Sequence, residues 1–409
     1  MPFAVAECER ARRDFPALNK TTATGERVAY FDGPGGTQTP RAVTEAIVAC
    51  YESRNANFDG MFQTSLDITE AVQQVRATVA DFLGAEDAAC ISFGANMTSL
   101  NFSLSHALGR SLRENDEVLI TALDHEANRG PWLGLAERGV RVREIAMTSN
   151  GMIDWDHFER LIGDRPRVVA MTLASNALGT VPDLSRAVQA AHDIGAVVVL
   201  DAVHFAAHFP VDVLALDADF LLCSAYKFYG PHIGILYAKT GLLDTLATDQ
   251  LTTQKSGAPY RIETGTLNYA AIEGVGAAVE YLASWGAGID RRAKLTEAMT
   301  AIGDYEHRLA KQYFDGLRNI DGVRYFGPDF EGARRAPTIS IAIAQLTPQQ
   351  VAARANDFGL QLWHGHFYAR RVIEELGLTA RGGLLRTGIS MYNTSEEVER
   401  LLGFLATLN

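Results

Sequence analysis

Short apolar runs alternate with helical patterns between about residue 66 and residue 240, and this alternation constrains the fold more than any other feature. Strands separated by helices form parallel sheets with helices on their faces. The chain has 409 residues, against about 100–150 for the commonest domain size. We therefore expect a largely parallel α/β domain and a second domain. The runs are 117-EVLI, 142-VREIAM, 168-VVAMTL, 197-VVVLDA, 219-DFLLCSA and 233-IGILYA.

One repeating unit of this pattern can be followed residue by residue. Asp183 is expected to cap a helix that ends at Gly195, and the β-branched run Val197 to Val199 follows as a strand. Asp201 then comes just after the carboxyl end of that strand. In open α/β sheets this edge is where ligands bind.

The pattern changes from about residue 286. A long helix is predicted through Lys311, a few strands around 337-PTISIAIA, and a final helix that begins with a capping box from Thr394 to Glu397. We predict a large domain over residues 26–285 and a smaller α+β domain over residues 286–409, packed with residues 1–25. No Pro/Gly/Ser linker separates them, so the two domains should share a substantial interface.

Charge and cysteine content exclude several classes of protein. The chain has 37 basic and 49 acidic residues, a formal net charge of −12, and no long basic cluster, so we expect no nucleic-acid binding. Its four cysteines are widely spaced, which favours a reducing compartment, the cytoplasm. No apolar run approaches the roughly 18–20 residues that span a bilayer, so no membrane association is expected. The cysteines are Cys8, Cys50, Cys90 and Cys223.

Lys227 is the most informative single residue. It follows an apolar strand in 219-DFLLCSAYKFYGPHIGILY and precedes a glycine-bearing turn, so we expect it to be half buried. Burial lowers the pKa of a lysine and allows its amine to condense with an aldehyde. The alternative is a structural lysine whose alkyl chain packs on the fold while its amine reaches solvent.

Two further features lie at strand ends. Asp201, unpaired after an apolar strand, would cost several kcal/mol of stability, on the order of 2–7, and a pyridinium nitrogen is one partner that would offset this cost. A loop amide or an arginine is the other possibility. In 93-FGANMTSLNFSL a strand passes through Gly94 and Ala95 into a helix, where a phosphate could bind. The alternative is an ordinary N-cap by Asn96 or Thr98.

Other motifs have weaker functional support. His364 with His366, and His204 with His208, lack the third ligand of a catalytic zinc site, so packed or hydrogen-bonded histidines and no metal are expected. The glycines of 33-GPGGT fit neither the GxGxxG nor the GK[ST] pattern, and no GxSxG motif is present.

Six further motifs follow one another along the chain: 124-DHEAN, 175-SNALGT, 201-DAVH, 224-SAYK, 263-ETGTLN and 386-RTGISMYNT. Taken together, these motifs resemble those of class V pyridoxal-phosphate enzymes, in the branch of cysteine desulfurases and selenocysteine lyases. The match runs from about Phe31 to the C-terminus. It implies pyridoxal 5'-phosphate as cofactor, an amino-acid substrate, a homodimer, and fold type I, in which a mostly parallel seven-stranded sheet accompanies the smaller C-terminal domain.

The resemblance also implies roles for individual residues. Lys227 matches the lysine that binds the cofactor covalently and moves the substrate proton, and Asp201 matches the partner of the pyridinium nitrogen. His125 matches a histidine that stacks on the ring and assists proton transfer, so it is expected to be catalytic together with Lys227 and Asp201. Asn176 and His204 match donors to the ring phenolate oxygen, although the position of His204 is usually glutamine.

The same comparison implies the remaining contacts. Arg386 matches the arginine that binds the substrate α-carboxylate, and Thr266 matches a phosphate contact donated by the partner subunit. Tyr226 replaces a histidine that normally reaches the phosphate. Cofactor phosphate contacts are further implied for Ala95, Asn96, Met97 and Ser224.

The chain departs from the family pattern at one segment. In a desulfurase the segment that here reads 363-WHGHFYA carries an arginine first and near its end a cysteine that accepts sulfur as a persulfide. This chain has Trp363 and Tyr368 at those places. A phenol cannot replace a thiolate as sulfur nucleophile. Cys223 is expected to be a buried structural thiol.

These observations favour a β-eliminating lyase for C–S or related bonds that needs no persulfide cysteine. Trp363 and Tyr368, expected to bind substrate, suggest a side chain bulkier than that of cysteine. Transamination or epimerisation with the same cofactor is a second hypothesis. A third hypothesis is a non-catalytic scaffold for sulfur assembly. A scaffold would have no need for a buried lysine and a buried carboxylate, because both cost stability.

Overall fold

A computed structural model describes residues 3–23, 25–332 and 334–408. Its largest element is a seven-stranded sheet with the order β2-β8-β7-β6-β5-β3-β4. None of the helices in these residues combines the length and apolar character that crossing a membrane requires. The strands of this sheet are β2 (Ile91–Gly94), β3 (Glu117–Thr121), β4 (Arg141–Ile145), β5 (Val168–Thr172), β6 (Val197–Asp201), β7 (Phe220–Ser224) and β8 (Gly234–Ala238).

The expected mostly parallel sheet is confirmed. Strands β4, β3, β5, β6 and β7 pair in parallel, whereas β8 is antiparallel to both β7 and β2. The segment between β7 and β8 is too short for a crossover helix, and therefore β8 returns in the opposite direction. Every residue of β5, β7 and β8 is buried, as expected when helices cover both faces of a sheet.

The helices connect the strands and cover the sheet. One detail of the sequence interpretation is wrong: the N-cap of α7 is Leu184, and Asp183 lies one residue earlier, where its carboxylate accepts hydrogen bonds from the amide and hydroxyl of Ser185. Gly195 follows the helix with a φ of 75°, as expected. The helices of this part are α2 (Arg41–Ser53), α3 (Gln63–Leu83), α4 (Met97–Gly109), α5 (Glu126–Leu133), α6 (Trp155–Ile162), α7 (Ser185–Asp193), α8 (Leu242–Thr245) and α9 (Tyr269–Ala283).

A second, four-stranded antiparallel sheet has the order β12-β13-β10-β9, and a parallel pair joins β1 to β11. The predicted capping box between Thr394 and Glu397 is present at α13. The elements are β1 (Ala29–Tyr30), β9 (Val323–Phe326), β10 (Thr338–Ile343), β11 (Leu360–Gln361), β12 (Trp363–Gly365), β13 (Leu384–Gly388), α1 (Val5–Arg13), α10 (Arg291–Leu317), α11 (Pro348–Asp357), α12 (Arg370–Glu375) and α13 (Ser395–Ala406).

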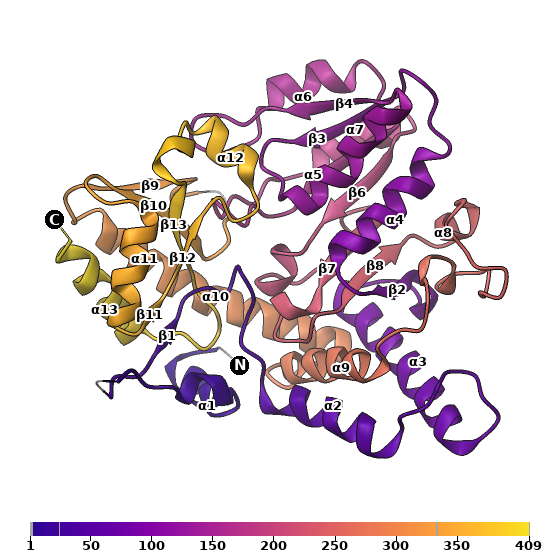
Figure 1. The fold of residues 1–409 in the computed structure, drawn as a ribbon, viewed down its shortest axis with the longest axis horizontal. Helices are drawn as coiled ribbons and strands as arrows, with labels where there is room; N and C mark the ends of the chain where they lie inside the picture. Colours follow the sequence, from indigo (N-terminus) through magenta and orange to yellow (C-terminus); the bar gives the residue numbers. More distant parts are fainter. Residues whose placement is uncertain (1–2, 24, 333, 409) are drawn as a thin grey trace.

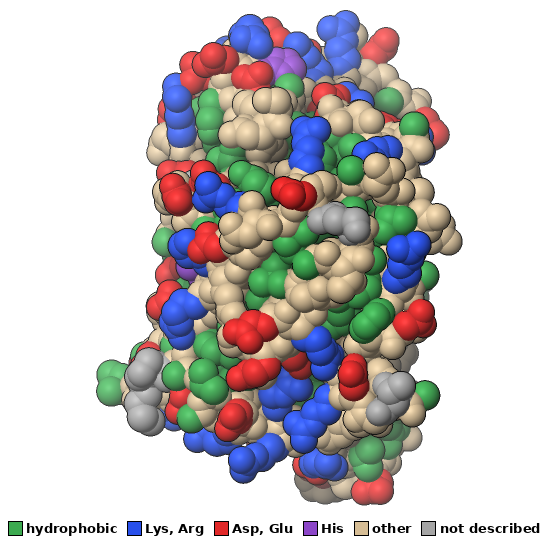
Figure 2. Space-filling model, turned by 90° about the vertical axis from the view of Figure 1, so that its left-hand side faces the viewer, with side chains coloured by type: hydrophobic (Ala, Val, Ile, Leu, Met, Phe, Trp, Pro, Cys, Tyr) green, Lys and Arg blue, Asp and Glu red, His purple; other side chains and the backbone are tan. Residues whose placement is uncertain are grey.

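Figure 1 shows the two sheets side by side, with the C-terminal elements to the left and α2, α3 and α9 below the larger sheet. A single hydrophobic cluster runs from Phe3 to Leu405 and includes buried residues of both parts. Because β1 pairs with β11, residues 29–30 lie with the C-terminal elements, and the boundary near residue 26 stays a prediction. On the face drawn in Figure 2, acidic and basic side chains are interspersed.

Candidate active site

Lys227 lies in a short 3-10 helix (Ala225–Lys227) directly after β7. Lys227 is more buried than the expected half, since only 8% of the residue is exposed. Its Nζ donates a hydrogen bond to the carbonyl of Pro34. Burial, helped by the positive charge of Arg386, lowers the pKa of Lys227 to about 7. A large fraction of this amine is therefore uncharged near neutral pH.

Asp201 ends β6, at the edge of the sheet where ligands bind in this class of fold. The carboxyl group is buried, and its Oδ1 accepts a hydrogen bond of 2.9 Å from the amide of Val203. Burial raises the pKa of Asp201 to about 7. A cationic partner in the cavity would hold this carboxyl group in its charged form.

His125 is the N-cap of α5, where its Nδ1 accepts a hydrogen bond of 3.0 Å from the amide of Ala127. Burial and the nearby charges of Lys227 and Arg386 lower the pKa of His125 to about 3. The ring is therefore neutral at physiological pH, and its proton is on Nε2. The ring centroid lies 5.7 Å from that of Tyr368.

One cavity brings most of the predicted residues together. Its lining also holds buried polar atoms that have no partner within the described residues: Oδ1 of Asn176 and Nδ1 of His204. Unpaired buried polar groups cost free energy, and they mark a place for a polar ligand. The residues fit pyridoxal phosphate, since the Lys227 amine, the Asp201 carboxyl group, an unpaired ring nitrogen of His204 and the N-terminus of α4 surround one space. The lining comprises Asn96, Met97, Thr98, His125, Ala127, Thr172, Ala174, Asn176, Asp201, Val203, His204, Ser224, Tyr226 and Lys227.

The N-terminus of α4 forms one end of this cavity. Asn96 is the N-cap, and its Oδ1 accepts from the amide of Ser99 at 2.9 Å. The amide of Met97 donates to the Ser224 hydroxyl at 3.1 Å. The helix end lies directly against β8, because a Cβ on Gly234 would come within 2.3 Å of the Asn96 carbonyl carbon. This end is suited to a phosphate.

Two predicted cofactor contacts lie outside the cavity lining. Ala95 and Thr266 border a separate hollow of about 430 Å³, together with Ser99 and His232. Tyr226 does line the cavity, and its ring stacks on that of His232 with centroids 4.7 Å apart. Thr266 is therefore not part of the lining of this cavity.

Arg386, on β13, is buried, and its guanidinium group already has partners within the chain. Its Nη2 lies 2.7 Å from Asp32 Oδ1, and its Nη1 donates to the carbonyl of Asn176 at 3.2 Å. Its Nε has no partner within the described residues. Sequence interpretation missed Asp32, although its place before the turn 33-GPGGT was a signal. The same turn supplies the Pro34 carbonyl that holds Lys227.

The segment from Trp363 to Ala369 lies beside the cavity and contacts two of its lining residues, Asn176 and His125. Trp363 and Tyr368 themselves line a separate hollow of about 620 Å³. Trp363 pairs with Arg386 across the sheet, and the Phe367 carbonyl accepts from Asn176 Nδ2 at 2.8 Å. The backbone of Tyr368 has a φ of 56°, which is rare for a large residue, and its carbonyl accepts from the Glu126 amide at 2.7 Å. The side chains of Trp363 and Tyr368 stay 49% and 62% exposed.

All four cysteines are buried and unpaired by disulfides. Burial raises the pKa of Cys8 to about 11 and that of Cys50 to about 12, and it also raises the pKa values of Cys90 and Cys223. Since the thiolate is the nucleophile, these thiols have low reactivity. Cys223 was expected to be a buried structural thiol, and it is buried in the structure.

Asp124 was missed as an individual residue, although its motif was noted. The fully buried carboxylate accepts from the amides of Thr121 and Thr172, each at 2.7 Å, and from Asn128 Nδ2 at 3.3 Å. It therefore holds the ends of β3 and β5 together behind His125. Burial raises its pKa to about 6.

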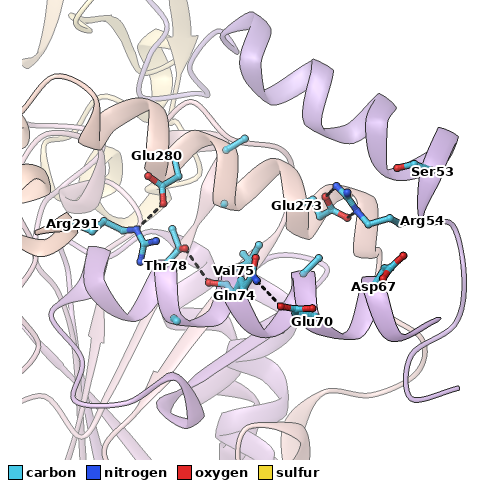
Figure 3. A pocket seen from close by; sticks show the side chains of 14 residues that line it. Ser53, Arg54, Asp67, Glu70, Gln74, Val75, Thr78, Glu273, Glu280 and Arg291 are labelled. Carbon is cyan, nitrogen blue, oxygen red and sulfur yellow. Dashed lines mark hydrogen bonds and ion pairs between the residues drawn. The ribbon is translucent and has the colours of Figure 1, made fainter. Parts of the chain in front are cut away.

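A larger cleft of about 700 Å³ lies between α2, α3 and α9 (Figure 3). Its charged side chains already pair with one another, as Arg54 does with Glu273 and Arg291 with Glu280. Over residues 3–23, 25–332 and 334–408, no three metal-ligating side chains group together. The cleft therefore offers no comparable chemistry.

Fold and cavity together define a class: an α/β enzyme with a buried lysine and a buried carboxylate facing one space. The model of the Aminotransferase class-V family matches residues 29–401, and the chain belongs to this family. It is a pyridoxal-phosphate-dependent enzyme, and it resembles cysteine desulfurases. The cysteine desulfurase of Klebsiella pneumoniae is 32% identical over 421 residues, which cover 99% of this chain and 98% of that protein.

Further relatives agree. The cysteine desulfurase of Synechococcus elongatus is 32% identical over 410 residues, which are 97% of this chain and 62% of that protein, so the chain spans about three fifths of that relative. The solved cysteine desulfurase of Thermococcus onnurineus superposes with a TM-score of 0.86 at 30% identity, covering 98% of this chain and 97% of that one. The fold type I architecture is confirmed. The solved cysteine desulfurase of Escherichia coli superposes with a TM-score of 0.84 at 28% identity, covering 98% of this chain and 98% of that one.

Proposed function

We propose that this protein is a lyase that eliminates a group from Cβ of an α-amino acid and uses no persulfide cysteine. The observation that carries the proposal is the segment beside the cavity, in which Tyr368 occupies the place expected for a sulfur-accepting thiol. No cysteine lies on that segment, and all four are buried, with raised pKa values. A sulfur relay through a thiolate has no candidate among them.

Lys227 and Asp201 carry the proton chemistry in this proposal. Bound pyridoxal phosphate supplies an aldehyde that condenses with amines and a ring that withdraws electrons. The lowered pKa of Lys227 leaves Nζ able to accept a proton from the substrate α-carbon. Asp201, in its charged form, would stabilise positive charge on a ring nitrogen of the bound cofactor. His125, neutral and capping α5, would pack against the ring.

Arg386 orients the substrate. Its guanidinium group binds the α-carboxylate, a role suited to a planar fork. Asp32 and the Asn176 carbonyl hold this fork in place, and the unpaired Nε offers a further donor. The α-proton of the bound substrate is thereby directed toward Lys227.

The substrate side chain meets an aromatic wall. Trp363 pairs with Arg386 across the sheet, and the ring of Tyr368 lies beside His125. Partly exposed aromatic side chains next to a site favour large or aromatic groups. We therefore propose a substrate whose leaving group is larger than the thiol of cysteine.

A homodimer completes the site. Thr266 lies outside the cavity of its own chain, which supports its proposed role as a phosphate contact in a partner subunit. Exposed apolar side chains lie on α2, at Val48 and Tyr51, and just before α3, at Met61 and Phe62. Exposed apolar side chains of this kind are candidates for a contact surface.

The test is a titration of the cofactor-loaded protein with a panel of amino acids, followed by product analysis. Pyruvate-type keto acids and ammonia formed without an added keto acid support elimination. A requirement for a keto acid indicates transamination instead, and inversion of the α-carbon indicates epimerisation. A cofactor band that responds to no amino acid would leave the scaffold hypothesis. Borohydride should attach the cofactor to Lys227, and Lys227→Ala should abolish this product.

A further inference from the structure

His204 stands where the family resemblance places a glutamine, and its environment is unusual. The residue is buried, lines the cavity and precedes a short 3-10 helix (Phe205–Ala207). Its Nε2 lies 3.0 Å from the hydroxyl of Thr338 in β10. Its Nδ1 is buried without a partner in the described part of the chain. The nitrogen left for a ligand is therefore Nδ1.

The ring of His204 is neutral. Burial, followed by the charges of His208, Lys227 and Arg386, holds the pKa of His204 well below its usual range. A neutral imidazole has one donor and one acceptor nitrogen, and the hydrogen bond at one nitrogen decides the role of the other. A glutamine at this position would have a donor in its amide group and would need no such control.

A second histidine holds this ring in place. His208 packs edge-on against His204, with ring centroids 5.0 Å apart. Its Nδ1 lies 2.7 Å from Glu306 Oε2 on α10, and both side chains are buried. The Glu306 carboxyl group also accepts from the hydroxyl of Tyr229 at 3.4 Å. The position of the His204 ring is therefore set by groups behind it.

The Thr338 hydroxyl decides which nitrogen carries the proton. Thr338 is fully buried, and within the described residues its hydroxyl has no other hydrogen-bond partner. If the hydroxyl donates to Nε2, its hydrogen is satisfied and Nδ1 carries a proton. If Nε2 donates instead, both the hydroxyl hydrogen and the Nδ1 lone pair stay buried without a partner. In the cofactor-free chain the first arrangement leaves one polar group unsatisfied, the Nδ1 N–H, whereas the second leaves two and is disfavoured.

We propose that Thr338 is a positioning residue that holds His204 as the Nδ1–H tautomer, so that this ring donates a hydrogen bond to an anionic oxygen of the cofactor. The inference rests on the proposed cofactor site. Thr338 belongs to the smaller sheet, where it pairs with Gly388, whereas His204 follows β6 of the larger sheet. Packing of the two sheets thus sets the hydrogen-bonding character of a cavity residue.

The test reads the proton position directly. Nitrogen-15 NMR of histidine-labelled protein is recorded with and without pyridoxal phosphate, and His204→Gln identifies the His204 signals among the 10 histidines. The wild type and Thr338→Ser should show Nδ1 protonated in both states. Thr338→Val should show a tautomer mixture without cofactor. Thr387→Val, which removes another buried hydroxyl of the same sheet, should leave His204 unchanged.

A second readout is cofactor retention. Thr338→Val should release pyridoxal phosphate with a dissociation constant about threefold to tenfold higher, as expected for one lost hydrogen bond, and Thr338→Ser should restore retention. A proton on Nε2 in the wild type, or wild-type signals in Thr338→Val, overturns the proposal. If Thr338→Val does not fold, the wild-type spectrum still decides. Failure of borohydride trapping at Lys227 would refute the cofactor site instead, because the tautomer is also read without cofactor.

Discussion

Arg386 and Asp32 form a buried ion pair, with Nη2 and Oδ1 2.7 Å apart, although 354 positions separate them in the chain. The pair forms because Asp32 bridges to Gly388, two residues after Arg386 on β13. The arginine proposed to bind substrate therefore has a carboxylate partner of its own. This partner fixes the direction of the guanidinium group before substrate arrives.

Asp32→Asn should lower the free energy of unfolding by about 3–5 kcal/mol, because removing one partner leaves a buried charge uncompensated. Urea unfolding of the cofactor-free protein measures the change. The matched control is Asp164→Asn, which breaks a more exposed pair with Arg143 and should cost less than about 1 kcal/mol. Equal losses in the two variants would contradict this account of Arg386.

Asp201→Asn should stabilise the cofactor-free protein at pH 8 but not at pH 4. Burial raises the pKa of Asp201 from 3.8 to about 7, so the folded chain binds this proton more tightly than the unfolded chain. The stabilisation that the protonated Asp201 gives the folded chain is fully present below pH 3.8 and is lost as the pH rises through about 7. An asparagine side chain does not ionise, so the variant does not lose stability in this way as the pH rises. The gain at pH 8 should be on the order of 4 kcal/mol, measured as the variant's denaturation midpoint against pH. A pH-independent difference would refute it.

Alanine at Trp363 or Tyr368 should raise KM for substrates with large side chains by about tenfold, since a lost aromatic contact costs about 1–1.5 kcal/mol. Covalent attachment of the cofactor to Lys227 should not change. Tyr325→Ala, which removes a partly exposed aromatic residue on β9, serves as control and should leave KM unchanged. Loss of cofactor in either site variant would point to a structural role instead.

The native protein should react with iodoacetamide on the order of 100-fold more slowly than the unfolded protein, because burial disfavours the thiolates. Mass spectrometry counts the modified cysteines, and guanidinium-unfolded protein provides the reference of four. Lyase activity should survive the treatment. Rapid inactivation, with one cysteine modified, would show that a thiol takes part after all.

Mixing two inactive variants tests the dimer. In the proposed assembly, a Lys227→Ala subunit still supplies Thr266 to its partner, and a Thr266→Ala subunit still supplies Lys227. After unfolding and refolding together, the mixture should regain part of the activity that neither variant has alone. Size-exclusion chromatography gives the oligomeric state. A monomer, or a mixture without recovery, would reject the proposed role of Thr266.

Residues that follow strands were predictable because the pattern of the strand determines where they lie. Asp201 and Lys227 come directly after apolar strands, and the carboxyl ends of such strands meet at one edge of the sheet. Asn96 was predictable as a cap for a similar reason. Thr338 carried no such local signal, since its partner His204 lies far away in the chain. Asp32 had only its place before the turn 33-GPGGT, which does not identify Arg386 as its partner. The degree to which Lys227 is buried was also underestimated, because the Pro34 turn that covers it comes from another part of the molecule.

The order of apolar runs, glycines and polar strand ends specified the α/β class and placed Asp201 and Lys227 at one edge of the sheet, and the family resemblance of the motifs implied the seven-stranded sheet, the cofactor and most of the cavity lining. These depend on local periodicity and on motifs whose residues are close in sequence. The packing of the two sheets decided the rest: the Asp32 partner of Arg386, the Thr338 contact of His204, and the burial of all four thiols. Hydrogen bonds and desolvation depend on which distant side chains meet, and only the tertiary structure brings them together.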